Sequence, residues 1–196
     1  MGIGMAEYTE RGIIESSKDW DKYCYFSKGL EYLGLSQLFY ISGIESEWFR
    51  SPLSEKLANS IGLLIHKSEN ICKFKEDILK TKIFWPKEIW SMYTKKLENF
   101  KDIQYIQSAT ECLNHLITNA LEHVVDGMEY LSMITNPSIL LFVSVPFLVA
   151  IETLSLCYDN SMIFLNTIYL RPGQIAQVTN FSHFFALWAM LITLLK

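Results

Sequence analysis

The chain has little that would indicate a secreted or nucleic-acid-binding protein. Its four cysteines are scattered and form no CxxC pair, which favours buried thiols in a reducing compartment over disulfides or zinc ligands. The sequence does not open with the basic start and apolar run of a signal peptide, so we expect a protein that is not secreted. The net charge of −4 counts against a nucleic-acid partner, because phosphate binding needs clustered Lys and Arg.

Linker-forming residues are also scarce. Glycine occurs 9 times and proline 5 times in 196 residues, and we find no Ser- or Gly-rich stretch and no repeat of fixed period. Half of the chain is apolar, which is enough for a sizeable core. We therefore predict a single globular domain over residues 1–196.

Helical periodicity dominates what is present. Apolar residues recur every three or four positions over 61–79, 17–40 and 106–134, and an almost wholly apolar run containing Pro146 covers 139–158. These patterns predict helices over these ranges in an all-α fold. We interpret 139–158 as a buried, kinked core helix shorter than a membrane span. The segment 42–55 is polar and predicts a surface connection, with Ser17 or Asp19 expected to cap the helix at 17–40.

The helix predicted over 61–79 carries polar residues along its other side: His66, Glu69, Asn70, Lys73, Glu76 and Asp77. Carboxylates one helical turn apart can share Mg²⁺, which prefers a few carboxylates together with phosphate oxygens. Position 73, one turn before Asp77, is however a lysine. The same residues also form a ladder of opposite charges on a solvated face, and the spacing leaves both interpretations open.

A second polar flank occurs within 106–134. His115, Asn119, Glu122 and His123 fall near one another on one side of that predicted helix. A metal face can be imagined there, but a single helix cannot close a metal site, and such flanks are usually solvated. We favour the solvated flank.

Several motifs stand in the order of a known family. NSIGLLIHKSENI at 59–71 is followed by FWP at 84–86, and the other matches are MGIGMAEY at 1–8, WDKYC at 20–24, GLSQLF at 34–39, ECLNHLITNALEH at 111–123 and TLSLCYDN at 153–160. The chain resembles the squalene synthases (farnesyl-diphosphate farnesyltransferases) over roughly residues 1–178. The resemblance implies the C-terminal portion of the isoprenoid synthase helical fold, with 179–196 as a divergent apolar tail.

The resemblance also implies an activity. Members of this family join two farnesyl diphosphates head to head through presqualene diphosphate to give squalene, in sterol biosynthesis, using Mg²⁺ and NADPH. It implies a location at the cytosolic face of the endoplasmic reticulum membrane. The family's usual C-terminal anchor is not found in this sequence: the apolar stretch 184–195 is shorter than a bilayer core. We therefore expect a cytoplasmic protein or peripheral membrane association.

Residue roles follow from the same matches. Tyr23 corresponds to the family's catalytic tyrosine, whose hydroxyl can donate a hydrogen bond and whose ring can stabilise a cation. Phe142 corresponds to a phenylalanine that lines the pocket of the second half-reaction. Glu76 and Asp77 remain from the second aspartate-rich motif as metal ligands, and Arg171 remains from a basic cofactor-binding segment.

The sequence departs from the family in ways that bear on activity. The first aspartate-rich motif is not found, and Lys73 replaces the leading aspartate of the second. Lys28, Glu31 and Tyr32 would crowd or charge the prenyl pocket, although Lys28 and Glu31 can pair; Phe147 replaces a polar residue.

Three hypotheses stay open from these departures. The chain is an impaired squalene synthase, active if the missing helices come from elsewhere. It is a non-catalytic paralogue that binds prenyl diphosphate or docks on a full-length squalene synthase. Or it is a helical interaction protein that has lost the ligand.

Overall fold

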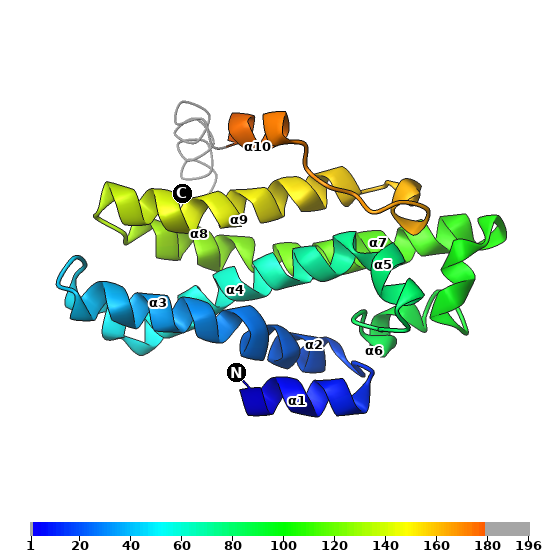
Figure 1. Ribbon diagram of the computed structural model, residues 1–196, viewed down its shortest axis with the longest axis horizontal. Coiled ribbons are helices and arrows are strands. Elements are labelled where there is room, and N and C mark those ends of the chain that lie inside the picture. The colour runs from blue at the N-terminus through cyan, green and yellow to red at the C-terminus, as the bar shows by residue number, and fades with distance from the viewer. Residues whose placement is uncertain (1, 179–196) are drawn as a thin grey trace.

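The computed structural model describes residues 2–178 and is helical over that range, with one isolated bridge between Ile13 and Ile83. Figure 1 shows the arrangement of the elements. In chain order they are α1 (Gly2–Arg11), α2 (Ser17–Cys24), the π-helical turn η1 (Tyr25–Gly29), α3 (Leu30–Ile41), η2 (Glu47–Arg50), α4 (Pro52–Cys72), α5 (Phe74–Leu79), α6 (Lys87–Trp90), η3 (Leu97–Lys101), η4 (Ile103–Tyr105), α7 (Ile106–Leu121), α8 (Val124–Ser132), α9 (Pro137–Cys157), η5 (Ser161–Phe164) and α10 (Pro172–Val178).

Helix α4 is the centre of the molecule. It packs against α7, α8 and α9 on one side and against η1 and α3 on the other, so it lies between these two layers in Figure 1. Its apolar stripe is fully buried at Leu57, Ile61, Leu64 and Ile71. Each such side chain contributes roughly 1.5–3 kcal/mol by leaving water, and this burial makes α4 the main support of the core.

The helix predicted over 61–79 is two helices. It begins earlier, at Pro52, because the Ser51 hydroxyl accepts the Ser54 N–H at 3.1 Å and caps the first turn. It breaks at Lys73, whose φ of −91° and ψ of 10° are not helical, and α5 then takes a new direction. The prediction of a surface connection over 42–55 was therefore too long at its C-terminal end.

The helix predicted over 17–40 follows one course but contains a π-helical turn, η1. Its N-cap is Ser16, whose hydroxyl accepts the Asp19 N–H at 3.1 Å, and not Ser17 or Asp19. The turn lies where η1 crosses α4 at very close range. A Cβ on Gly62 would stand 2.7 Å from the Gly29 backbone, so only glycine allows the two segments to touch.

The pattern over 106–134 divides into α7 and α8 at Glu122 and His123. The apolar run over 139–158 is confirmed as a helix, but α9 is 21 residues long with Pro146 inside it. It is the one helix in the described residues that is long and apolar enough to cross a membrane, with 39% of the most apolar window buried. The prediction that it is shorter than a span was wrong, because the helix begins at Pro137 and continues past Pro146.

The four cysteines are unpaired and buried, as predicted. Phe147 is fully buried, and its ring lies where a Cβ on Gly127 would stand; this ring packs α9 onto α8 and is part of the core. The predicted apolar tail at 184–195 lies outside the described residues, and the assignment of one domain to residues 1–196 stays a prediction.

Candidate functional site

Tyr23 is buried among aromatic rings at the end of α2. Its ring stacks on Phe84 with centroids 5.4 Å apart and an interplanar angle of 18°, and it meets the Tyr8 ring edge-on at 5.3 Å. The His66 ring lies 5.2 Å away. Burial, more than any charge, raises the pKa of Tyr23 well above its usual value. The phenol therefore stays protonated and remains a hydrogen-bond donor.

A cavity of about 330 Å³ opens beside this ring; we call it the aromatic cavity. It is lined by Tyr8, Gly12, Ile13, Ile14, Tyr23, Lys80, Thr81, Lys82, Ile83 and Phe84. Apolar rings and aliphatic groups form most of the wall, and two lysines stand at one side. Its volume lies within the range typical of small-molecule sites.

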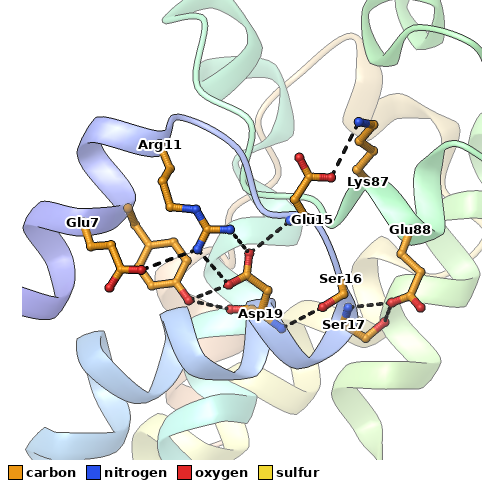
Figure 2. Close-up of polar contacts among 9 residues, drawn as sticks. Glu7, Arg11, Glu15, Ser16, Ser17, Asp19, Lys87 and Glu88 are labelled. Atoms are coloured by element: carbon orange, nitrogen blue, oxygen red, sulfur yellow. Dashed lines mark hydrogen bonds and ion pairs between the residues drawn. The ribbon is translucent and has the colours of Figure 1, made fainter.

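A polar cluster holds one wall of the aromatic cavity in place (Figure 2). Asp19 accepts hydrogen bonds from the Tyr8 hydroxyl at 2.7 Å, from Arg11 at 3.1 and 3.2 Å and from the Glu15 N–H at 3.1 Å. Burial pushes the pKa of Asp19 upward, but these hydrogen bonds outweigh it and hold the pKa below its usual value. Asp19 thus stays ionised and ties α1 to α2.

Further contacts join the connection between α1 and α2 to helix α6. The Lys87 N–H donates to the Ile14 carbonyl and the Glu88 N–H to the Glu15 carbonyl, each at 2.9 Å. Figure 2 also shows the Glu88 carboxylate accepting from the N–H and hydroxyl of Ser17, at 2.8 and 3.1 Å. Backbone pairing fixes the register here, since exposed ion pairs alone contribute little. The segment between α1 and α2, which lines the aromatic cavity, is therefore tied to α6.

The aromatic segment after α5 anchors the adjoining loop by burial. Trp85 is 2% exposed, and its indole N–H donates to the Asn70 carbonyl at 3.2 Å. Pro86 directly precedes α6, where a missing N–H costs nothing.

Glu76 and Asp77 lie on α5 but engage different partners. Glu76 accepts a short hydrogen bond from the Tyr169 hydroxyl and has the Lys80 ammonium at 4.0 Å. Neighbouring helical positions point about 100° apart, so the two carboxylates do not converge. Burial raises the pKa of Asp77, opposed by the positive charges of Lys73 and Lys80.

These residues do not fit a magnesium centre as they stand. The part of the chain from residue 2 to 178 holds no group of three or more His, Cys, Asp or Glu that could bind a metal. One carboxylate is engaged by a tyrosine and the other faces lysines, which repel a divalent cation. The assignment of Glu76 and Asp77 as metal ligands stays a prediction, and carboxylates from outside these residues would be needed to complete it.

The other residues assigned by resemblance lie apart from the aromatic cavity. Phe142 is 60% exposed on α9 and does not line it. Arg171 is exposed at the start of α10, where its backbone N–H donates to the Gln174 side chain at 3.0 Å. The contact of Tyr169 with Glu76 brings its segment against α5. Arg171 is the one Lys or Arg in the segment 169–178, and its assignment to a cofactor stays a prediction.

The structure contains a buried charge cluster that the sequence reasoning missed; we call it the Lys67 cluster. Lys67 is fully buried, with its ammonium 2.5 Å from the Asp21 carboxylate, 2.8 Å from the Asn119 oxygen and 2.9 Å from His123 Nε2. It also lies 5.0 Å from the centre of the Trp20 ring. The signal was present, since Lys67 interrupts the apolar stripe between Leu64 and Ile71.

The Lys67 cluster also shows which partners the second polar flank, on α7 and the start of α8, has in the structure. Asn119 and His123, considered for a metal face, accept the lysine instead, and His115 pairs with the Tyr93 hydroxyl at 3.1 Å. Two residues of the flank, Asn119 and His123, are therefore not merely solvated, because they bind Lys67 of α4.

The charges of Lys28 and Glu31 disturb the predicted prenyl pocket less than expected. Lys28 and Glu31 pair at 2.8 Å, as anticipated. Their side chains are 32% and 45% exposed, so neither is a buried, unpaired charge. Tyr32 is buried and its ring adds bulk between α3 and the core.

The packed helical layers and the tyrosine-bearing cavity define the described residues as an all-α protein with a small-molecule-sized cavity. A family model described as squalene/phytoene synthase matches residues 1–173. The chain belongs to the squalene/phytoene synthase family.

Individual relatives agree with this assignment. The squalene synthase of Dictyostelium discoideum is 40% identical over 180 residues, 92% of this chain and 42% of that protein. The human squalene synthase is 42% identical over 177 residues, 89% of this chain and 41% of that protein. A protein of Arabidopsis thaliana named inactive squalene synthase 2 is 40% identical over 181 residues, 91% of this chain and 43% of that protein. The chain thus spans about two fifths of the length of the relatives it matches.

A solved structure agrees over the same region. The complex of TcSQS with the ligand BPH1237 superposes with a TM-score of 0.87 at 35% sequence identity, covering 92% of this chain and 52% of that chain. This similarity extends to the three-dimensional arrangement of the helices, so the predicted all-α isoprenoid synthase fold is confirmed for the described residues.

Proposed function

We propose that the chain is a squalene synthase-like transferase of sterol biosynthesis, acting on farnesyl diphosphate, with its catalysis impaired. The observation that carries this proposal is the burial of Tyr23 beside the aromatic cavity, whose volume is typical of small-molecule sites, with the Tyr23 hydroxyl protonated. The ring faces and the phenol meet the two demands of the reaction, since cations need an apolar aromatic wall and the leaving group needs a hydrogen-bond donor.

The proposal includes the family's two cofactors, Mg²⁺ and NADPH, and each is assigned to different residues. Bound Mg²⁺ would neutralise diphosphate, and bound NADPH would supply hydride. For NADPH the residue offered is Arg171, and for Mg²⁺ the residues are Glu76 and Asp77, which need further carboxylates. The partners proposed are farnesyl diphosphate and a full-length squalene synthase. A location at the cytosolic face of the endoplasmic reticulum, by peripheral association, is consistent with the apolar surface of α9, on which Leu141 and Phe142 are exposed.

A specific observation favours a second candidate, a non-catalytic paralogue that binds prenyl diphosphate. Tyr169 occupies the Glu76 carboxylate, and Lys73 stands one turn before Asp77. Sequence identity does not separate the two candidates, because a relative named as inactive is as similar as those named as enzymes. The distinction therefore depends on product formation.

The test is incubation of the purified chain with farnesyl diphosphate, Mg²⁺ and NADPH, followed by extraction of squalene and presqualene diphosphate. Lys73→Asp is assayed in parallel, because it restores a carboxylate one turn before Asp77. Slow product formation that Lys73→Asp increases supports an impaired transferase. No product from either protein, with both helical by circular dichroism, refutes catalysis and leaves the paralogue.

A further inference from the structure

The turn that follows α5 gathers positive charge beside the aromatic cavity. Residues 73–82 contain four lysines and two acids, a local net charge of +2 in a chain whose net charge is −4. Lys80, Thr81 and Lys82 form the turn, which we call the lysine turn, and all three are exposed. This basic stretch contrasts with the acidic balance of the molecule as a whole.

The backbone of the lysine turn is fixed in place. The Lys82 N–H donates to the Asp77 carbonyl at 2.8 Å, and the Thr81 N–H donates to the Ile78 carbonyl at 3.2 Å. Thr81 has a φ of +56°, a left-handed conformation that costs a β-branched residue free energy and that recurs at functional sites. Both lysines are thereby held at the wall of the aromatic cavity rather than on a free chain.

The lysines of this turn have little internal neutralisation. Lys80 reaches Glu76 only at 4.0 Å, with 63% of its side chain exposed. Lys82 and Lys73 form no ion pair within 4 Å of a described carboxylate, although both act on the charge of Asp77. Lys82 also lines the small space between Asp77 and Phe84. The ammonium groups of Lys80 and Lys82, the two lysines that line the aromatic cavity, are therefore available to an anion at its mouth.

We infer that the lysine turn binds the diphosphate of a prenyl diphosphate directly, without a bridging metal, while the aromatic cavity takes the start of the prenyl chain. Ammonium groups bind phosphate oxygens as point charges, which replaces the neutralisation that a metal would provide. The inference rests on the proposed function for its ligand but not for catalysis. In this inference Asp77 has the opposite of its expected role: its negative charge repels the diphosphate instead of holding it through a metal.

The test is isothermal titration of the full chain with inorganic pyrophosphate and with farnesyl diphosphate, in EDTA and in millimolar Mg²⁺. We expect saturable binding of both in EDTA, with farnesyl diphosphate tighter because its chain leaves water. Farnesyl diphosphate binding without pyrophosphate binding would overturn the inference, since apolar contact alone would then explain it. Binding that requires Mg²⁺, or no binding of either, would also overturn it.

Variants give the sharper result. Lys82→Gln should weaken pyrophosphate binding about tenfold, the loss of one charge-assisted hydrogen bond, and Lys95→Gln, an exposed lysine elsewhere, should change it less than about twofold. Asp77→Asn should tighten binding about threefold, because a repelling charge is removed. Weaker binding by Asp77→Asn would contradict the inference, since that is the behaviour of a metal ligand. Circular dichroism checks that each variant is folded.

The two proposals fail in different ways. Metal-independent pyrophosphate binding without any squalene refutes the proposed catalysis and leaves this inference standing. Squalene formation together with binding that depends on Mg²⁺ and Asp77 refutes this inference and leaves the proposed catalysis standing.

Discussion

Replacing Lys67 by methionine tests the Lys67 cluster. The substitution keeps an unbranched apolar stem up to the ε position but removes the ammonium, which is 0% exposed and lies 2.5 Å from Asp21. Two further acceptors, Asn119 and His123, lose their contact at the same time. Breaking a buried ion pair from one side costs about 3–5 kcal/mol. We expect the lower end, about 3 kcal/mol, because 41% of the Asp21 side chain reaches solvent.

Urea unfolding followed by far-UV circular dichroism measures this loss. For a chain of this length, 3 kcal/mol corresponds to a fall in Tm of about 6–12 °C. The matched control is Lys56→Met, because Lys56 also pairs with an acid, Asp126 at 3.4 Å, but is 68% exposed. That variant should lose less than about 1 kcal/mol.

A double-mutant cycle with Asp21→Asn separates the pair from general packing. Burial raises the pKa of Asp21, but hydrogen bonds from His123 and Lys67 outweigh it, so the pKa lies below its usual value. The coupling energy between Lys67 and Asp21 should be about 1.5 kcal/mol or more. If Lys67→Met unfolds at the same urea concentration as Lys56→Met, the cluster does not stabilise the fold and the reasoning is refuted.

Two more predictions concern packing and pH. Gly62→Ala should destabilise the chain by about 1–3 kcal/mol, because its Cβ would stand 2.7 Å from the Gly29 backbone. Gly34→Ala, in α3 with nothing within 4 Å of the added Cβ, should be neutral or stabilise the chain by up to about 1 kcal/mol. Equal urea midpoints for the two variants would contradict this prediction. The lowered pKa of Asp19 means that its contribution to stability is present above the unfolded-state pKa of about 3.9 and is lost as pH falls through the folded value. Asp19→Asn should therefore be less stable at neutral pH and lose less stability than the wild type during acid titration; parallel titration curves for the two proteins would argue against the Asp19 contacts.

The sequence predicted the features that depend on local periodicity. The apolar spacing of Leu64 and Ile71 identified the core face of α4. Motif order gave the family, which the matched relatives confirm. These features are encoded within a few turns of one helix or in contiguous motifs.

What could not be predicted depends on contacts between distant segments. The π-helical turn at 25–29 lies against Gly62, and the break at Lys73 reflects where α5 must lie against its neighbours. Lys67 appeared as one polar residue on an apolar stripe because its partners, Asp21 and His123, are far away in sequence. Tyr169 and Glu76, 93 positions apart, show the same limit for the candidate site.

On α5, Glu76 accepts a hydrogen bond from Tyr169, and Asp77 lies in the positive field of Lys73 and Lys80. We therefore conclude that these two carboxylates do not by themselves bind a divalent cation. Titration with Mn²⁺, followed by the electron paramagnetic resonance signal of the free ion, is the decisive measurement. We expect the wild type to remove no more free Mn²⁺ than Asp77→Asn does. Stoichiometric loss of the free signal with the wild type, abolished by Asp77→Asn, would contradict this conclusion.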